Sequence, residues 1–536
     1  MSETSGRLRR ALPYVGLVSG GLAVGVLLLV AMEVALRLLG VAAGPHRDPF
    51  AGFSHVVRMF QPTVHDGVKV YQLSPARAIS ATGRTDAGPQ REFLQQKLPG
   101  TFRIFVLGDS SGAGVPYGTG YAFSFWLQKR LENELPDVHF EVVNAAMPGY
   151  ASRRLVTVAE EIAAYAPDLV IVYIGHNEFA ERRYYAHLLD MDPRIFRLRE
   201  LLVGTRLWGL ASALLQGSGQ QHDDGRPQID MQALEKNEPR EMFAVLDERA
   251  GGQGYATARE RDYGEMLYRF NLRTIIHTLR AAGSRVMFVT LTQNFASWAP
   301  GASAHRDGLS AADLDKWTGM VADGDRWADT DHDYAKALAA YQEALAIDDH
   351  FADLVYREAK CEEQLGRFDA ARLHYRRASD LDQVPHGAPT HFNDILREMA
   401  QTEGAMLTDA DAAVSAASPH GLVGDDLFAD WVHPNIHAHQ IIAAAIATEL
   451  WRAGVPVSPD RWVLGHYQDP DPEVLFAEKP KLRIGEHVAR MGTCLLAHRK
   501  DCALAEVDAS MAIEPENPYW QQTRAEVLRQ AAGWPQ

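Results

Sequence analysis

The stretch Phe102-Arg-Ile-Phe-Val-Leu-Gly-Asp-Ser-Ser-Gly-Ala-Gly114 decides the fold of this chain. Its first half, residues 102–107, is a short apolar run typical of a strand that is buried on both faces of a parallel sheet. The run stops at small and polar residues, and Ser110 follows three positions after the last apolar residue. We therefore expect a buried strand whose carboxyl end presents Ser110 on a tight turn.

Further apolar runs extend this pattern along the chain and alternate with segments of helical periodicity. Strands that alternate with helices predict an α/β fold with a doubly wound parallel sheet. In such sheets, ligands bind beyond the carboxyl ends of the strands. The other predicted strands are residues 140–144, 169–174 and 285–291, and the predicted helices are about 123–134, 152–165 and 262–282.

The composition is that of a folded protein with several domains. At 536 residues the chain is too long for one ordinary domain, and 46% apolar and 23% charged residues exclude a mainly disordered or collagen-like chain. The net charge of −16 leaves no basic surface for nucleic acid, so we expect no nucleic-acid partner. Three cysteines are too few for a disulfide-dense scaffold or a four-cysteine zinc site.

The N-terminus predicts a membrane anchor. Residues 11–32 carry no charge, and about 20 apolar residues suffice to cross a bilayer as a helix. Three arginines lie in residues 1–10, and basic flanks tend to remain cytoplasmic, so the rest of the chain is expected outside the membrane, in the periplasm or the extracellular space. A cleaved signal peptide is the alternative, because small residues at 41–43 offer a cleavage site, although an apolar core of about 7–15 residues is usual there.

Residues 41–100 are rich in proline and glycine and predict a membrane-proximal linker with a strand or two. Farther along, several residues recur at a spacing of 34, for example Tyr341 and Tyr375. This period, with alanine and aromatic residues at matching places, resembles tetratricopeptide repeats. We expect such helices as an insertion at 311–382 and again at 484–532, where they would bind a partner protein or pack on the sheet domain.

Four short blocks carry the functional argument. Taken singly they are weak, since a lone Gly-Asp-Ser is usually a turn. Together and in this order they resemble the SGNH hydrolases, also called the GDSL family. The blocks are Gly108-Asp-Ser110-Ser-Gly112, Asn144-Ala-Ala-Met-Pro-Gly149, Gly175-His-Asn177-Glu178 and Asp430-Trp-Val-His433-Pro434.

The resemblance covers residues 101–300 and 385–455 and implies a role for each block. Ser110 would be the nucleophile, His433 the general base and Asp430 the residue that orients His433. An oxyanion hole would come from the Ser110 and Gly149 N–H groups and the Asn177 side chain. The mechanism needs no cofactor or metal, and the substrate would carry an ester. The block with Asn177 ends in Glu178 where the family more often has aspartate.

The residue types suit this chemistry without the family. A serine hydroxyl is a poor nucleophile until a base takes its proton, and an imidazole titrates near neutrality. Asp430 lies three residues before His433, so one turn of backbone brings its carboxylate to the Nδ1 side of the ring. Backbone N–H groups and an amide stabilise the oxyanion that forms on attack, at roughly 3–4 kcal/mol per strong donor.

Two other readings of the glycine-rich turn are weaker. Residues 108–112 also read Gly-x-Ser-x-Gly, as in α/β-hydrolases, but those enzymes usually place the acid well before the histidine. A dinucleotide-binding loop fails because the glycines at 112, 114 and 118 have the wrong spacing. Ser111, next to Ser110, is an alternative nucleophile.

Several further residues have open roles. His176 contacts substrate or packs, and Asn294 binds substrate or ties a loop. Arg153 and Arg154 meet an anionic substrate or are solvated at a helix start. Cys494 and Cys502 flank a predicted helix–helix turn and would form a disulfide in an oxidising compartment.

These observations favour a membrane-anchored, extracytoplasmic serine esterase. A second hypothesis keeps the same residues but transfers the acyl or acetyl group to a cell-envelope or exported polysaccharide, because a triad does not decide between water and a sugar acceptor. An O-acylated glycan is then a candidate substrate. A third hypothesis is a non-catalytic envelope scaffold that uses its repeats.

Overall fold

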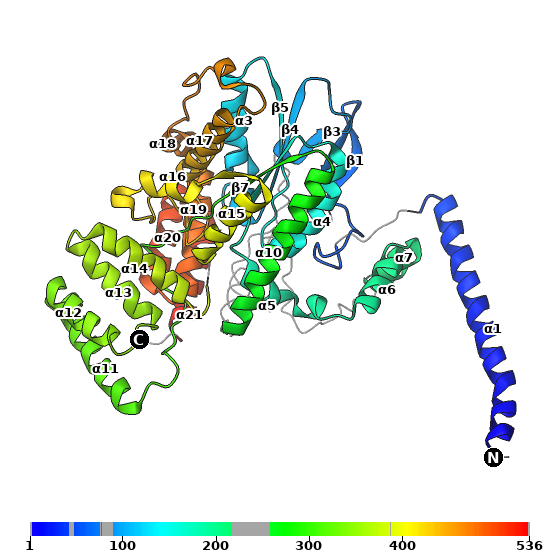
Figure 1. Ribbon diagram of the computed structural model, residues 1–536, viewed down its shortest axis with the longest axis horizontal. Coiled ribbons are helices and arrows are strands. Elements are labelled where there is room, and N and C mark those ends of the chain that lie inside the picture. The colour runs from blue at the N-terminus through cyan, green and yellow to red at the C-terminus, as the bar shows by residue number, and fades with distance from the viewer. Residues whose placement is uncertain are drawn as a thin grey trace. The chain divides into compact units, whose positions relative to one another are not determined.

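Figure 1 shows the computed structural model of the chain. The chain divides into two compact units, which are described separately. The smaller unit holds residues 1–57, 75–77 and 187–226, and the larger unit holds 58–74, 78–186 and 227–536. Residues 42–47 and 78–88 of the predicted linker lie outside the described part. The structure describes residues 3–41, 48–75, 77, 89–216, 258–385 and 387–533.

A five-stranded parallel sheet forms the centre of the larger unit, which confirms the predicted α/β class. The strand order is β5-β4-β6-β7-β8. In chain order, the first four strands of this sheet are the apolar runs predicted from the sequence. The fifth strand, only three residues long, was not predicted. The strands are β4 (Thr101–Gly108), β5 (His139–Asn144), β6 (Leu169–Tyr173), β7 (Arg285–Val289) and β8 (Met406–Thr408).

The strand order explains which helices lie on each face. The chain steps from β4 to β5 in one direction and then crosses back to β6, so right-handed crossovers place α3 and α4 on opposite faces. Helix α10 packs against α4 and α15 on one side, and α3 packs against α17 on the other (Figure 1). These helices are α3 (Phe123–Glu134), α4 (Ser152–Ile162), α10 (Ala258–Ala281), α15 (His391–Glu403) and α17 (Ile436–Arg452).

A small antiparallel sheet, β1 (Phe60–His65), β2 (Val68–Leu73) and β3 (Glu92–Leu94), lies within the predicted linker. It belongs to the core of the larger unit. The Phe93 ring packs edge-on against Phe105 of β4, with centroids 5.2 Å apart. The N–H groups of Met59 and Phe60 donate to the Glu161 carboxylate of α4 at 2.7 and 2.9 Å. These strands therefore form part of the domain and are no spacer.

Two helical hairpins, followed by α15, lie between β7 and β8 in the chain. Positions that repeat after 34 residues are buried in both: Tyr341 and Tyr375 are 2% and 1% exposed. The Tyr341 ring leaves no room for a side chain at Gly324, where an added Cβ would lie 2.3 Å from it. The tetratricopeptide character itself remains a prediction. The helices are α11 (Ala311–Asp325), α12 (Tyr334–Leu345), α13 (Ala352–Gln364) and α14 (Phe368–Leu381).

Helices α16 (Ala410–Ala417), α17 and α18 (Pro472–Glu478) follow β8 in the chain, and three more helices follow them. The last three, α19 (Pro480–Leu496), α20 (Lys500–Ile513) and α21 (Pro518–Ala531), share a small apolar core that includes Trp298 from the loop after β7. Cys494 and Cys502 form a disulfide at the turn between α19 and α20, as the sequence allowed.

The smaller unit contains α1 (Glu3–Leu38), α6 (Pro193–Val203) and α7 (Arg206–Gln216). The Glu33 carboxylate of α1 accepts hydrogen bonds from the backbone N–H groups of Arg206 and Leu207, both at 3.1 Å, and so caps the start of α7. The predicted span, residues 11–32, falls within α1. In the part of the chain that the structure describes, no helix is both long and apolar enough to cross a membrane.

Candidate active site

Ser110 is the first residue of α2 (Ser110–Ala113), a single turn that follows β4 directly. The preceding Asp109 caps this turn, and its carboxylate accepts the Ser111 N–H at 3.0 Å. The chain must pass very close to β6 here, because a Cβ added to Gly108 would lie 2.6 Å from the Tyr173 carbonyl oxygen. The turn thus holds the Ser110 hydroxyl at the carboxyl edge of the sheet, where the sequence predicted it.

The structure brings Ser110 together with His433 and Asp430. The Ser110 Oγ lies 2.8 Å from His433 Nε2, and His433 Nδ1 lies 2.6 Å from Asp430 Oδ2. The two ring nitrogens therefore face a hydroxyl on one side and a carboxylate on the other. This is the arrangement in which an imidazole takes a serine proton while the carboxylate fixes its orientation.

Asp430 is held as the charged partner of the histidine. Its Oδ1 accepts the backbone N–H groups of Val432 and His433, both at 2.9 Å, and its side chain is almost completely buried. Burial alone would raise the pKa of this carboxyl, but the facing His433 and these hydrogen bonds together lower it. Asp430 thus remains ionised at neutral pH and stabilises an imidazolium.

Two side chains outside the triad hold the histidine loop. The Asn294 amide donates to the Asp425 carboxylate at 2.7 Å and to the Asp430 carbonyl at 3.3 Å. The Ser111 hydroxyl, fully buried, donates to the Val432 carbonyl at 3.0 Å. Asn294 is therefore a loop-tying residue, one of its two predicted roles. Ser111 supports the loop, and the imidazole faces Ser110.

Gly149 ends the second block in a left-handed conformation, with φ of +74°, which favours glycine. Its carbonyl accepts a hydrogen bond from the Arg154 guanidinium. Arg154 is 2% exposed, stacks on the Tyr150 ring at 4.1 Å and donates to Glu181 at 2.6 Å. The expectation that Arg154 is solvated or meets an anionic substrate is wrong, because this side chain is fully engaged inside the protein. Arg153 is exposed.

The third block leads into α5 (Glu178–Leu189) and is tied to the second. The Asn177 amide donates to the Tyr150 carbonyl at 3.1 Å. The Glu178 carboxylate accepts both the N–H and the hydroxyl of Ser152 at 2.8 Å, at the first residue of α4. Burial raises the pKa of Glu178 to about 8, and the charge of Glu181 adds to the shift. The starts of α4 and α5 thus form one network around Gly149 and Asn177.

Sequence reasoning missed an arginine that supports this edge. Arg91, 2% exposed, donates from Nη1 to the carbonyls of Asn144 and Ala146 at 2.8 and 2.7 Å. The Asn144 amide in turn donates to the Gly112 carbonyl at 2.9 Å. Arg91 lies in the predicted linker, and no local pattern marks an arginine that acts across more than fifty positions.

Two buried histidines near the triad are structural. His176 Nδ1 accepts the Ala388 N–H at 3.1 Å, and burial lowers the pKa of this ring. His439 Nδ1 accepts the Phe123 N–H at 3.2 Å, and burial lowers its pKa to about 3. Both rings are therefore neutral acceptors of backbone hydrogen bonds. For His176 this agrees with the packing role that the sequence left open.

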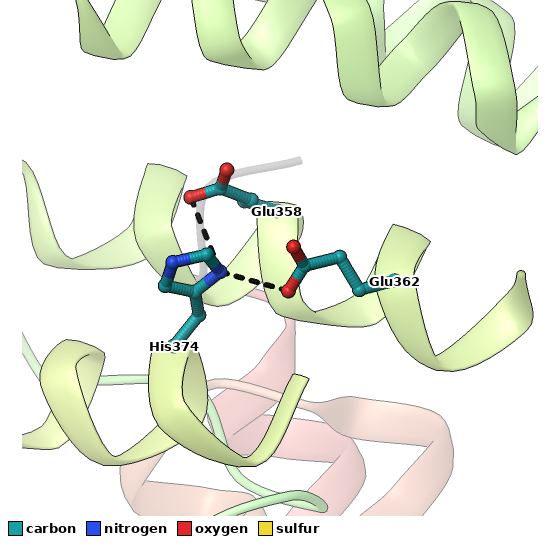
Figure 2. Close-up of side chains that lie close together, drawn as sticks. All are labelled: Glu358, Glu362 and His374. Carbon is teal, nitrogen blue, oxygen red and sulfur yellow. Dashed lines mark hydrogen bonds and ion pairs between the residues drawn. The ribbon is translucent and has the colours of Figure 1, made fainter. Parts of the chain in front are cut away.

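A separate group of possible metal ligands lies in the insertion. Glu358, Glu362 and His374 place one ligand atom each within 4.8 Å of one another (Figure 2). The sequence did not suggest a metal site. The spacing of the two glutamates was visible in it, but the approach of His374 depends on how α13 and α14 pack.

Comparisons with known proteins agree with the site. The profile of the GDSL-like lipase/acylhydrolase family matches residues 106–378, about half of the chain. This match contains Ser110, Gly149 and Asn177 and ends before Asp430 and His433, which the fold brings to the same place. No curated protein matches the chain.

Several solved structures are similar to this chain, at low sequence identity and low TM-score. An acetyl xylan esterase is 12% identical, over 65% of this chain and 98% of its own, with a TM-score of 0.29. The acetylxylan esterase Axe2 from Geobacillus stearothermophilus is 13% identical, over 65% and 94%, with a TM-score of 0.27. A GDSL-like lipase from Bacteroides thetaiotaomicron is 9% identical, over 66% and 88%, with a TM-score of 0.27. The family profile carries the assignment: the chain belongs to the GDSL-like lipase/acylhydrolase family and is a serine ester hydrolase.

Proposed function

We propose that this enzyme cleaves its ester substrate through an acyl-enzyme on Ser110. The observation that carries the proposal is the 2.8 Å contact between Ser110 Oγ and His433 Nε2, because it joins a hydroxyl to the base that can activate it. Ser110 Oγ attacks the ester carbonyl and its proton passes to His433 Nε2. Asp430 supports the resulting imidazolium through Nδ1.

The same groups complete the turnover. The imidazolium gives its proton to the departing alcohol oxygen as the ester bond breaks, which leaves the acyl group on Ser110. Water then attacks the acyl carbon while His433 takes its proton, and the proton returns to Ser110 as the carboxylic acid leaves. The Ser110 and Gly149 N–H groups and the Asn177 amide are the proposed oxyanion donors. One N–H of the Asn177 amide donates to the Tyr150 carbonyl, so the other N–H is directed elsewhere and suits the role of oxyanion donor.

The test is labelling by a fluorophosphonate together with hydrolysis of nitrophenyl acetate by the full chain. We expect wild type to be labelled and active and Ser110→Ala to lose both. Ser111→Ala is the matched control, and it should keep the label because its hydroxyl faces the Val432 carbonyl. Labelling of Ser110→Ala at the wild-type rate would overturn the proposal.

The fate of the acyl group separates hydrolysis from transfer. We propose water as the acceptor. Incubation with an acetyl donor, with and without acetyl-free oligosaccharide, should release acetate in equal amounts. An acetylated oligosaccharide that requires Ser110 would show that this enzyme is an acyltransferase.

We further propose that the enzyme is membrane-anchored with its catalytic unit outside the cytoplasm. The uncharged run 11–32 behind three arginines supports this placement, as does the Cys494–Cys502 disulfide, since disulfides persist in oxidising compartments. On α6, Leu198 and Leu201 are 57% and 73% exposed beside Arg194 and Arg197. An exposed apolar stripe flanked by arginine suits a bilayer interface.

Cell fractionation and protease protection test this location. The full chain should sediment with membranes and become accessible to protease from the outer side of the cytoplasmic membrane, whereas a chain that begins at residue 48, which retains only the α6 stripe, should sediment much less. Recovery of the full chain in the soluble cytoplasmic fraction with reduced Cys494 and Cys502 would contradict the placement and would leave the esterase proposal intact.

A further inference from the structure

Two glutamates and a histidine meet between the helices of one hairpin, apart from the residues of the candidate active site. Glu358 and Glu362 lie one turn apart on α13, so their side chains project from the same face. His374 reaches them from α14. Its Nδ1 lies 2.8 Å from Glu362 Oε2 and 3.6 Å from Glu358 Oε2, and Figure 2 shows both carboxylates directed at the ring.

Among the described residues, His374 is the one ion-pair partner of the two carboxylates. Glu358 and Glu362 are 5% and 4% exposed, and neither forms an ion pair with a lysine or an arginine within the described ranges. Glu358 accepts a hydrogen bond from the Gln342 amide through Oε1 at 3.2 Å. Its other oxygen points at the imidazole from beyond hydrogen-bond distance. Two carboxylates buried this deeply are costly without a positive charge beside them, and the one side chain in direct contact with both is the His374 imidazole.

The spacing of the three ligand atoms suits a metal ion. Ligands held about 2.0–2.1 Å from a tetrahedral ion lie roughly 3.3–3.4 Å from one another. The two separations from His374 Nδ1, 2.8 and 3.6 Å, bracket this value, so small side-chain rotations would place all three atoms around one ion. An imidazole with two carboxylates favours a transition metal such as Zn²⁺ over Mg²⁺ or Ca²⁺, which prefer oxygen ligands alone.

We propose that Glu358, Glu362 and His374 bind one divalent transition-metal ion, with Zn²⁺ as the probe. The ion would join α13 to α14 and place a full positive charge in direct contact with the two buried carboxylates. Such a site would lie apart from the esterase chemistry, because all three ligands come from one hairpin of the insertion and none belongs to the triad. Water would complete the coordination.

Calorimetric titration of the full, chelator-treated, tag-free chain with Zn²⁺ tests the proposal. We expect one equivalent to bind to wild type and a rise in the unfolding temperature on binding. Glu362→Gln and His374→Ala should each weaken Zn²⁺ binding at least tenfold and lose the temperature rise. His350→Ala is the control, because His350 is an exposed histidine of the same insertion and lies outside the cluster.

Cobalt absorption provides a measurement that needs no variant. Co²⁺ bound to wild type should give d–d bands without a thiolate charge-transfer band, because the proposed ligands include no sulfur. A thiolate band would place the ion on the neighbouring Cys361 and overturn the assignment. Failure of wild type to bind Zn²⁺, or equal binding by wild type and His374→Ala, would also overturn it.

Discussion

At the scale of single residues, the site depends on which oxygen faces which nitrogen. Ser110 and Ser111 are neighbours, yet only Ser110 meets His433, while Ser111 is turned to the Val432 carbonyl. The turn of α2 sends successive side chains in different directions, so adjacent hydroxyls have different environments. Adjacent residues of one type therefore carry different functions.

Replacement of Asp430 by asparagine should lower kcat by about 10⁴-fold with little change in KM, because the amide cannot stabilise the imidazolium and favours the wrong tautomer. Steady-state hydrolysis of nitrophenyl acetate measures the effect. Asp426→Asn is the control on the same loop, and its activity should remain near wild type. Similar rates for the two variants would show that Asp430 does not act on His433.

Glu178 predicts a pH dependence of stability. Its pKa rises from 4.5 to about 8 on folding, so between these values the folded chain holds more protons than the unfolded chain. Its contribution to stability is therefore fully present below about pH 4.5 and is lost as the pH rises through about 8. Wild type should lose stability over this range relative to Glu178→Gln, which keeps the shape without the charge.

Thermal unfolding of both proteins from pH 5 to pH 9 measures this difference. The difference in unfolding temperature between Glu178→Gln and wild type should shift in favour of Glu178→Gln as the pH rises. This difference should become constant above about pH 8. Glu160→Gln, an exposed change on α4, should follow the wild-type curve. If the unfolding temperatures of Glu178→Gln and wild type varied with pH in parallel, the pKa of Glu178 in the folded protein would be ordinary.

At the scale of elements, the first turns of α4 and α5 work as a pair. Glu178 and Glu181 of α5 bind the backbone and side chains at the start of α4, and Arg154 connects Glu181 to the Gly149 carbonyl. The N-cap of α4 is Ala151, whose side chain makes no capping hydrogen bond. The position of the Gly149 N–H thus depends on contacts between two helices.

Arg154→Met should destabilise the protein by about 3–5 kcal/mol, because Glu181 would remain buried without its cation. It should also lower kcat/KM of the folded fraction, since the Gly149 carbonyl loses its donor. Chemical unfolding and steady-state kinetics measure the two effects. Arg153→Met is the matched control and should change neither by much, because Arg153 is exposed. Equal effects of both variants would show that the network does not hold the loop.

At the scale of the whole larger unit, the active site is assembled across the insertion. Ser110 and His433 are 323 positions apart, and the hairpins α11–α14 lie between them in the chain. The hairpins are bonded to the sheet domain: the Tyr356 hydroxyl donates to the Ala296 carbonyl at 2.7 Å, and Arg376 forms a two-pronged ion pair with Asp411. Because of these contacts, the insertion and the sheet should unfold together.

Tyr356→Phe tests this coupling. The change leaves the Ala296 carbonyl without its donor and should cost about 1–3 kcal/mol. We expect one cooperative thermal transition, shifted down, with no separate transition for the hairpins. Tyr334→Phe is the control, because the Tyr334 hydroxyl has no hydrogen-bond partner among the residues that the structure describes. Two resolved transitions would show that the insertion is an independent domain.

The central sheet and the residues that meet at the triad could be predicted from local patterns. Each of β4 to β7 is a short apolar run, since a strand covered on both faces needs apolar residues throughout. Ser110, Asp430 and His433 stood out because their blocks are short and ordered. β8 was missed because three residues are too few for a period. For β1 to β3 the sequence predicted only a strand or two without positions, because charged and proline residues obscure their alternation.

The network of buried charged side chains that supports the active site could be identified only from the tertiary packing. Arg91, Arg154 and Glu181 are charged residues that sequence places on the surface by default, and each is buried because its partners come from distant segments. The meeting of His374 with two glutamates has the same origin. Apolar periodicity is a property of neighbouring residues, so it can be recognised in the sequence. The burial of a charged side chain depends on a partner that folding brings from a distant segment, so only the tertiary structure reveals it.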